Sequence, residues 1–249
     1  MKTLGLLGGT SYPSTILYYT TINNHTHSKL GGSHSAPLLL HSFDFSTLLA
    51  RVSASNGDWA SASSLLIPAA QNLVSIGASA IVVCENVIHA AAPPVQEALP
   101  AHIPILHVVD AVGAKLRDAG VKKVGLLATK GVMEGDYYVP PLRTRYGLDV
   151  VTPSPGETAW VDHVIFEELG KGVVAQRSRE KVLGIIEGLR EQGAEAVVLA
   201  CTDLAPLLEG EVEKGRVRGV RVYDSTVVHA EFVAEWAMAG GEGKRGVIG

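Results

Sequence analysis

The chain has 249 residues, 47% of them hydrophobic and 18% charged, a balance that suits a globular protein with a sizeable core and excludes a disordered chain. Its net charge of −4 provides no basic surface for nucleic acid or an anionic membrane, and no apolar run approaches the roughly 20 residues of a spanning helix. Two cysteines without Cys-x-x-Cys spacing argue against a disulfide scaffold or a zinc site, so we expect a soluble, reduced, cytoplasmic protein that binds neither nucleic acid nor membrane.

Short apolar segments alternate along the chain with longer segments of helical character. In chain order, the predicted strands are Thr3–Leu7, Pro37–Ser42, Ala80–Val83, Ile105–Val109, Lys123–Ala128, Asp149–Val151, Ala196–Ala200 and Val220–Tyr223. The predicted helices are Ser14–Thr26, Trp59–Ile76, Val87–Ala98, Ala111–Ala119, Thr158–Gly170, Ser178–Gln192 and Val227–Met238. This alternation, with strands rich in Val, Ile and Leu, predicts an α/β fold in which mostly parallel sheets are flanked by helices.

Two segments of the sequence are repeated later in the chain, with nearly the same spacing between the first and second copies. Residues 1–10 resemble the segment that begins 120 positions later, and Leu73–Asn86 resembles Leu189–Thr202, which lies 116 positions later. Such a repeat predicts two pseudo-symmetric lobes, each with its own sheet, and an active site in the cleft between them.

The lobe boundaries are expected, to within about ten residues, at two places in the chain. Lobe 1 would comprise residues 1–98 with 207–249, and lobe 2 residues 99–206. Residues 240–249 are rich in glycine and charge and are expected to form a disordered tail.

The repeat places Glu85 opposite Cys201, whereas Cys84 falls opposite Ala200 and is assigned to the core. Glu85 and Cys201 each follow an apolar strand, at the edge where α/β sheets bind their ligands. A helix N-terminus lowers the pKa of a thiol, and partial burial raises that of a carboxyl group, so both groups would suit acid–base chemistry. Facing each other across a cleft, the pair would move a proton on and off a carbon atom from two sides.

Polar groups at the ends of the predicted strands suit a substrate carboxylate. Backbone N–H groups and side-chain donors are expected from Gly9, Thr10, Ser11, Asn86, Thr129 and Thr202. Asp203 would cap the helix after Cys201, and His89, one helical turn after Glu85, would orient that carboxylate. The histidines show no metal spacing, and both G-x-G-x-x-G and the P-loop motif are absent, so no cofactor and no metal is expected.

Over nearly its whole length the chain resembles the aspartate/glutamate racemase family. The resemblance rests on the motifs GLLGGTSYPSTILYY, LHSFDF, IVVCENVIHAA, IPILHVVDA, VGLLAT and VVLACTDLAPLL. It implies a cofactor-independent enzyme with two pseudo-symmetric α/β lobes, catalytic residues on both sides of the cleft and a small amino-acid or carboxylic-acid substrate. A homodimer is implied by the resemblance alone.

The chain departs from the family pattern at the first catalytic motif. Where the family has Cys-Asn-Thr, or Thr-Asn-Thr in a close subgroup, this chain has Glu85–Val87, whereas Cys201–Asp203 corresponds to the second motif, Cys-Thr-Glu. Two basic residues of the family fall near Trp160 and near Leu48, with Arg51 one turn further on. The absence of these two basic residues argues against an acidic amino acid as the substrate, and Trp160 would favour a larger or less charged substrate.

The leading hypothesis is a racemase or epimerase, independent of pyridoxal phosphate, that exchanges the proton α to a carboxylate through Glu85 and Cys201. One alternative is one-sided chemistry on another carboxylic acid, as a decarboxylase, isomerase or lyase with a single active cysteine. Another alternative is a non-catalytic ligand-binding relative, which the altered first motif supports.

Overall fold

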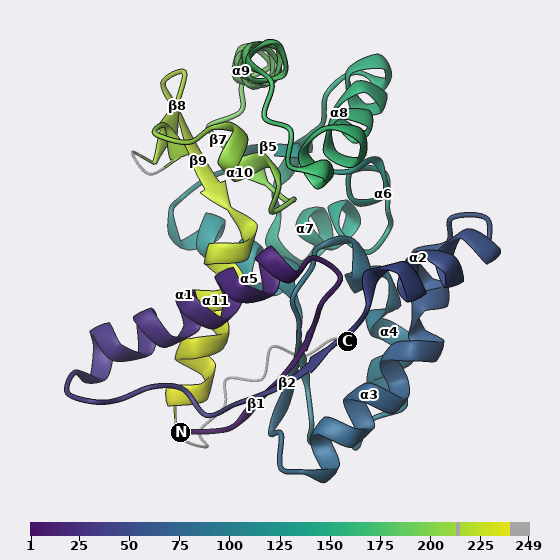
Figure 1. Cartoon of the computed structure of the whole chain (residues 1–249). Coiled ribbons are helices and arrows are strands. Elements are labelled where there is room, and N and C mark those ends of the chain that lie inside the picture. Colours follow the sequence, from purple (N-terminus) through teal and green to yellow (C-terminus); the bar gives the residue numbers. More distant parts are fainter. Residues whose placement is uncertain (213–214, 240–249) are drawn as a thin grey trace. The chain divides into compact units, whose positions relative to one another are not determined.

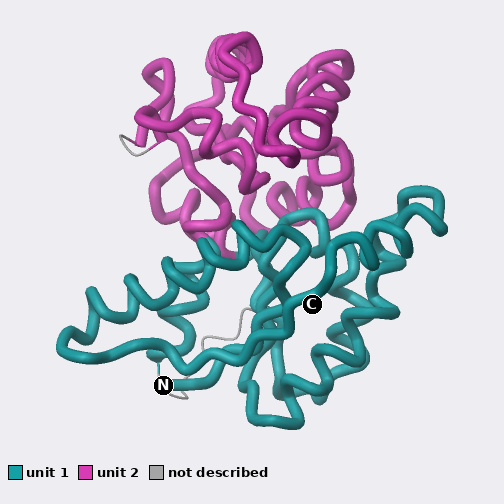
Figure 2. Tube along the Cα trace, viewed as in Figure 1, with its two compact units in different colours: residues 1–110, 229–249 teal, residues 111–228 magenta. Residues whose placement is uncertain are grey.

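The computed structural model describes residues 1–212 and 215–239, which divide into two compact units (Figure 2). Unit 1 comprises residues 1–110 and 229–249, and unit 2 comprises residues 111–228. The limits between the units fall inside two helices, α5 (Val108–Asp118) and α11 (Ser225–Met238). The expected tail, 240–249, lies outside the described residues.

Among the described residues of unit 1, four parallel strands form sheet A, in the order β2-β1-β3-β4 (Figure 1). The strands are β1 (Leu4–Gly8), β2 (Leu38–Ser42), β3 (Ala80–Val83) and β4 (Ile105–Leu106). The helices are α1 (Tyr12–Leu30), α2 (Phe45–Ala54), α3 (Ser63–Ser75) and α4 (Ala92–Glu97), with the 3₁₀ helices η1 (Trp59–Ala62) and η2 (Val87–Ala91).

Helices cover both faces of sheet A (Figure 1). On one face, Leu4 and Leu6 form a buried cluster with Tyr18 of α1 and with the part of α11 that belongs to unit 1. On the other face, α3 lies against β1. All five residues of β1 are buried, as expected of a parallel strand that is covered on both sides.

In unit 2, the described strands form sheet B in the order β6-β5-β7-β9-β8, in which β8 alone pairs antiparallel. The strands are β5 (Lys123–Leu127), β6 (Asp149–Val151), β7 (Ala196–Leu199), β8 (Arg216–Val217) and β9 (Val220–Asp224). The helices are α6 (Lys130–Met133), α7 (Val139–Tyr146), α8 (Pro155–Glu167), α9 (Gln176–Glu191) and α10 (Leu204–Leu207), with the 3₁₀ helix η3 (Leu169–Lys171).

The two units repeat one strand order and one register. In unit 1, β1 lies between β2 and β3, and in unit 2, β5 lies between β6 and β7 in the same way. Leu4 pairs with Ala80 at the start of β3, and its counterpart Val124 pairs with Ala196 at the start of β7. The internal sequence repeat therefore reflects a repeated α/β architecture, and the predicted fold class is confirmed.

Each predicted strand has a counterpart in the structure, but some elements differ from expectation. The helix expected over Trp59–Ile76 is divided into η1 and α3, and the one expected over Val87–Ala98 is divided into η2 and α4. The strand expected over Ile105–Val109 ends at Leu106, because α5 begins at Val108. The helices α2 and α7 and the two-residue strand β8 were not predicted. The unit limits lie later in the chain than the boundaries expected near 98 and 206. The reason is strand pairing, because β4 pairs with β3 in unit 1 and β9 pairs with β7 in unit 2.

A glycine in each leading strand, β1 and β5, lies close to the helix that covers the strand. A Cβ atom built on Gly5 would lie 3.2 Å from the Cβ of Leu73 in α3, and one on Gly125 would lie at the same distance from the Cβ of Leu189 in α9. Leu73 and Leu189 are themselves partners in the sequence repeat. The missing side chain thus lets each helix approach its sheet closely.

We expect Gly5→Ala and Gly125→Ala each to lower the free energy of unfolding by about 1–3 kcal/mol, because the added methyl group overfills a close contact. Urea denaturation would measure the loss. Gly184→Ala is the matched control, since Gly184 lies exposed in α9 with open space around it and alanine there favours the helix. Wild-type stability in both strand variants would contradict the close packing.

Candidate active site

Glu85 stands at the carboxyl edge of sheet A, directly after Cys84. The N–H of Cys84 donates to the carbonyl of Leu7 at 3.0 Å and extends the pairing of β3 with β1 to its last bond. Glu85 is 9% exposed, and its Oε1 accepts a hydrogen bond of 2.9 Å from the N–H of Asn86, which is buried. Cys84 lies in the hydrophobic core, where burial strongly raises the pKa of its thiol.

The loop after β1 lies beside Glu85 because the start of α1 is bonded to the end of β3. The Ser14 hydroxyl donates to the carbonyl of Cys84 at 2.7 Å, and Ser11 caps the helix by accepting from the N–H of Ser14. The structure thereby brings Ser11 and the buried Thr10 to the same edge of sheet A as Glu85.

The expected role of the Gly9 N–H as a substrate donor is not supported. This N–H already donates to the Thr15 hydroxyl at 2.9 Å. Gly9 has a φ of +88°, and a Cβ there would lie 2.2 Å from the carbonyl oxygen of Phe43. Close packing of two loops explains this glycine.

His89 is fully buried on η2 and contacts the main chain of Glu85. Its Nδ1 lies 2.9 Å from the Glu85 carbonyl oxygen, and its Nε2 accepts from the N–H of Val108 at 3.3 Å. The sequence-based expectation was that His89 orients the Glu85 carboxylate, whereas His89 Nδ1 contacts the Glu85 carbonyl.

Cys201 occupies the position in unit 2 that Glu85 occupies in unit 1. The N–H of the preceding Ala200 donates to the carbonyl of Leu127 at 2.8 Å, which repeats the bond between Cys84 and Leu7. Cys201 is 5% exposed at the carboxyl edge of sheet B.

The helix after Cys201 differs from the expectation. α10 has only four residues, and its N-cap, Asp203, makes no side-chain capping bond. A single turn has little of the dipole of a longer helix, so a helix N-terminus does not explain an activated thiol here. Burial raises the pKa of the Asp203 carboxyl group.

Two threonine hydroxyls lie buried at this edge of sheet B. Thr129 follows β5 and Thr202 follows β7, and both side chains are buried. Neither hydroxyl finds a hydrogen-bond partner among the described residues. An unpaired buried hydroxyl costs about 1–3 kcal/mol, so a polar ligand atom in this place would be favourable.

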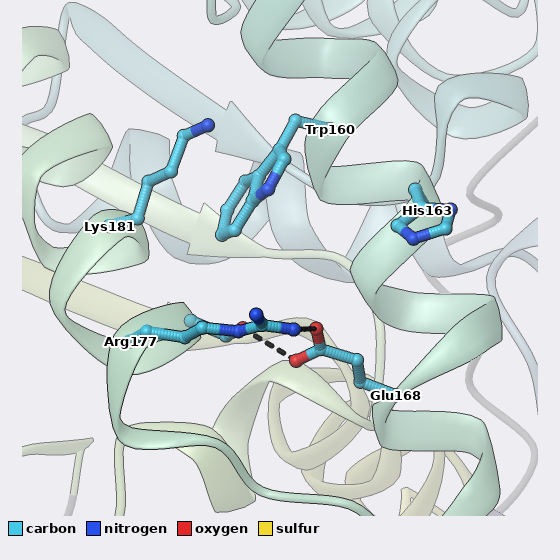
Figure 3. A pocket seen from close by; sticks show the side chains of 6 residues that line it. Trp160, His163, Glu168, Arg177 and Lys181 are labelled. Carbon is cyan, nitrogen blue, oxygen red and sulfur yellow. Dashed lines mark hydrogen bonds and ion pairs between the residues drawn. The ribbon is translucent and has the colours of Figure 1, made fainter.

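Trp160 lies in a pocket between α8 and α9 with a volume of about 360 Å³ (Figure 3). The ammonium group of Lys181 stands 4.1 Å from the centre of the Trp160 ring, and Arg177 pairs with Glu168 at 3.1 Å. Two residues further along α8, Asp162 accepts a bond from the N–H of Lys130, next to Thr129. Since residues two apart point about 200° apart on a helix, Trp160 points away from the Thr129 loop.

Sequence reasoning missed one pair of ionisable residues at the sheet edges, His107 after β4 and Asp224 at the end of β9. Each accepts a hydrogen bond from the N–H two residues later, Val109 in the first case and Thr226 in the second. Both side chains are buried, and burial raises the pKa of the Asp224 carboxyl group. Alignment of the fourth strands of the two repeats would have revealed their equivalence.

The remaining expected residue, Arg51, is exposed in the last turn of α2. Over residues 1–212 and 215–239, no group of three His, Cys, Asp or Glu side chains is arranged to hold a metal ion. None of the helices in that part of the chain is long and apolar enough to cross a membrane.

Comparison with known proteins gives a consistent result. The family model described as Asp/Glu/hydantoin racemase matches residues 7–233. Among solved structures, a "putative Asp/Glu racemase" from Yersinia pestis has a TM-score of 0.86 and 37% identity, with 96% of this chain and 100% of that chain covered. An aspartate racemase homologue from Pyrococcus horikoshii has a TM-score of 0.79 and 32% identity, with the same coverage.

The curated relatives are more distant in sequence. A glutamate racemase from Glaesserella parasuis is 30% identical over 134 residues, which cover 54% of this chain and 48% of the relative. The chain thus spans about half the length of the curated relatives that it matches.

Proposed function

The chain belongs to the Asp/Glu/hydantoin racemase family, and we propose from this that it is a cofactor-independent racemase or epimerase. It would exchange the proton α to the carboxylate of a small amino acid or related acid. Glu85 and Cys201 would be its two bases, each serving one face of the same carbon atom. The observation that carries the proposal is their equivalence in the repeated units, where each directly follows the same strand-pairing bond.

In the proposed reaction, one base removes the α-proton while the conjugate acid of the other delivers a proton to the opposite face. The electron pair of the broken C–H bond passes into the carboxylate, which becomes an enediolate-like dianion. Hydrogen-bond donors aimed at this group lower the barrier because the charge develops there. The unpaired hydroxyls of Thr129 and Thr202 and the amide of Asn86 are the proposed donors.

The unlike pair of bases has a kinetic consequence. An ordinary glutamate carboxyl and an ordinary thiol differ in pKa by about four units, so the ionised-carboxyl, neutral-thiol form of the free enzyme would exceed the reverse form by about 10⁴-fold. Because a racemisation has an equilibrium constant of 1, kcat/KM must be equal in both directions. Diffusion to the rare form would then cap kcat/KM at about 10⁴–10⁵ M⁻¹s⁻¹, unless the site brings the two pKa values together.

The proposed substrate class is an amino acid or hydroxy acid without a second carboxylate. The support is the loss of the family's basic residue near Leu48, since Arg51, one turn further on, is exposed on α2. A charged side chain in a buried site needs an opposite charge to offset its desolvation.

Proton–deuterium exchange followed by NMR, against a panel of amino, hydroxy and unsaturated acids in deuterium oxide, tests the proposal. A racemase introduces deuterium at the α-carbon and yields both enantiomers from either one. Release of carbon dioxide, or a single labelled product, would indicate one-sided chemistry instead. No exchange with any acid, together with tight binding of one of them, would indicate a ligand-binding relative.

A further inference from the structure

The imidazole of His89 and the carboxylate of Glu85 are both hydrogen-bonded to the same peptide group, the one between Glu85 and Asn86. The carbonyl of that peptide belongs to Glu85 and lies 2.9 Å from His89 Nδ1. Its N–H belongs to Asn86 and donates to Glu85 Oε1 at 2.9 Å. The orientation of this single planar unit therefore determines where the N–H points, and with it where the carboxylate is held.

The contacts of His89 define its tautomer. A carbonyl oxygen only accepts, so Nδ1 must carry the proton, and the N–H of Val108 only donates, so Nε2 must offer its lone pair. The imidazole is therefore neutral and uses both nitrogens. Burial lowers the pKa of His89 to about 4, which agrees with a neutral ring near neutral pH.

His89, the Glu85–Asn86 peptide and the N–H of Val108 together form what we call the clamp, and it is anchored in the core of unit 1. Val108 is the first residue of α5, and the ring of His107 lies 4.5 Å from that of His89, centroid to centroid. The ring of His229 lies 5.5 Å away and is held by the carbonyl of Leu106 at 2.7 Å. Burial lowers the pKa of His229 to about 3, so its ring is neutral as well.

At the equivalent position of unit 2, no imidazole is present to hold the peptide after Cys201. The residue that corresponds to His89 in the repeat is Ala205 in α10, and the carbonyl of Cys201 accepts instead from the N–H of Leu204 at 3.2 Å. This difference matches the difference in side chains, because the glutamate side chain has more freely rotating bonds than the cysteine side chain and needs more restraint.

We infer that His89 is a positioning residue, which fixes the Glu85–Asn86 peptide so that the Asn86 N–H holds the Glu85 carboxylate in place for proton transfer. The inference rests on the proposed function of Glu85 as one of the two bases. Its effect should be confined to the face of the substrate that Glu85 serves, since His89 contacts the peptide group that also holds the Glu85 carboxylate.

The test compares His89→Asn with His89→Gln. Asparagine places an N–H near the position of Nδ1 and can still donate to the Glu85 carbonyl, whereas glutamine places its oxygen near Nε2 and can only replace the bond to Val108. Each variant loses one buried hydrogen bond, so both should lose similar stability. The readout is the initial rate at which an α-deuterium label washes out of each enantiomer separately.

We expect His89→Gln to slow wash-out at least tenfold from one enantiomer, the same one that Glu85→Gln affects, and His89→Asn to retain most of the wild-type rate. His229→Asn is the matched control, because it removes a buried imidazole of the same cluster without touching the Glu85–Asn86 peptide, and it should slow neither enantiomer selectively. Equal loss from both enantiomers, or equal rates in the Asn and Gln variants, would overturn the positioning role. Wild-type protein that exchanges neither enantiomer would refute the proposed function itself.

Discussion

Replacement of Cys201 by alanine is expected to lower the kcat of racemisation by about 10²–10⁴-fold, the range that a positioned acid–base group contributes. The thiol would deliver the proton in one direction and remove it in the other, so both directions should fail together. The fold should survive, because the side chain is small and stands at the edge of sheet B. Polarimetry measures the racemisation, and circular dichroism checks the fold.

Cys84→Ala provides the matched control for this prediction. Both cysteines are buried and follow equivalent strands, but Cys84 lies in the hydrophobic core of unit 1, one residue before the proposed base. Its loss should cost stability through the cavity that it leaves and should spare kcat. An active Cys201→Ala protein, or an inactive and well-folded Cys84→Ala protein, would place the chemistry elsewhere.

Glu85→Gln is expected to reduce racemisation by a similar factor, about 10²–10⁴-fold, because an amide cannot take up the α-proton. The amide oxygen can still accept from the N–H of Asn86, so the local structure should persist. Cys201 would remain intact, so α-deuterium wash-out should continue for one enantiomer and stop for the other. Separate wash-out rates for the two enantiomers measure this asymmetry.

The control for charge is Glu97→Gln, which removes an exposed carboxylate from α4 in the same unit. It should leave both wash-out rates unchanged. If Glu85→Gln slowed both enantiomers equally, Glu85 would hold the substrate rather than serve one face of it. If it slowed neither, the one-sided chemistry of a single cysteine would become the better description.

The sequence repeat gave a specific and testable equivalence between residues. Residue spacing alone paired Glu85 with Cys201, and the strand register independently makes Cys84 equivalent to Ala200. This worked because a parallel strand buried on both faces leaves an apolar run of characteristic length, and the residue after the run marks the sheet edge. The same reasoning predicts Thr129 and Thr202 at the edge of sheet B, where both hydroxyls are buried and have no hydrogen-bond partner among the described residues.

Local reasoning was less successful where distant segments meet. The Gly9 N–H looked available in the sequence, but it is bonded to Thr15. The helix after Cys201 looked able to activate a thiol, but α10 ends after one turn. The length of a short helix depends on packing against its surroundings more than on its own residues, so its sequence is a weak guide.

The sequence by itself determined the α/β fold, the duplication, the family and the two candidate bases, because these depend on periodic burial and on motifs that are local in the chain. Only the tertiary structure decided which donors are free and how Glu85 is held. The clamp on Glu85 joins His89 to Val108, 19 residues away, and no local pattern of the sequence encodes that contact. Hydrogen bonds between segments are selected by the packing of the whole unit, and they become visible only when the chain is folded.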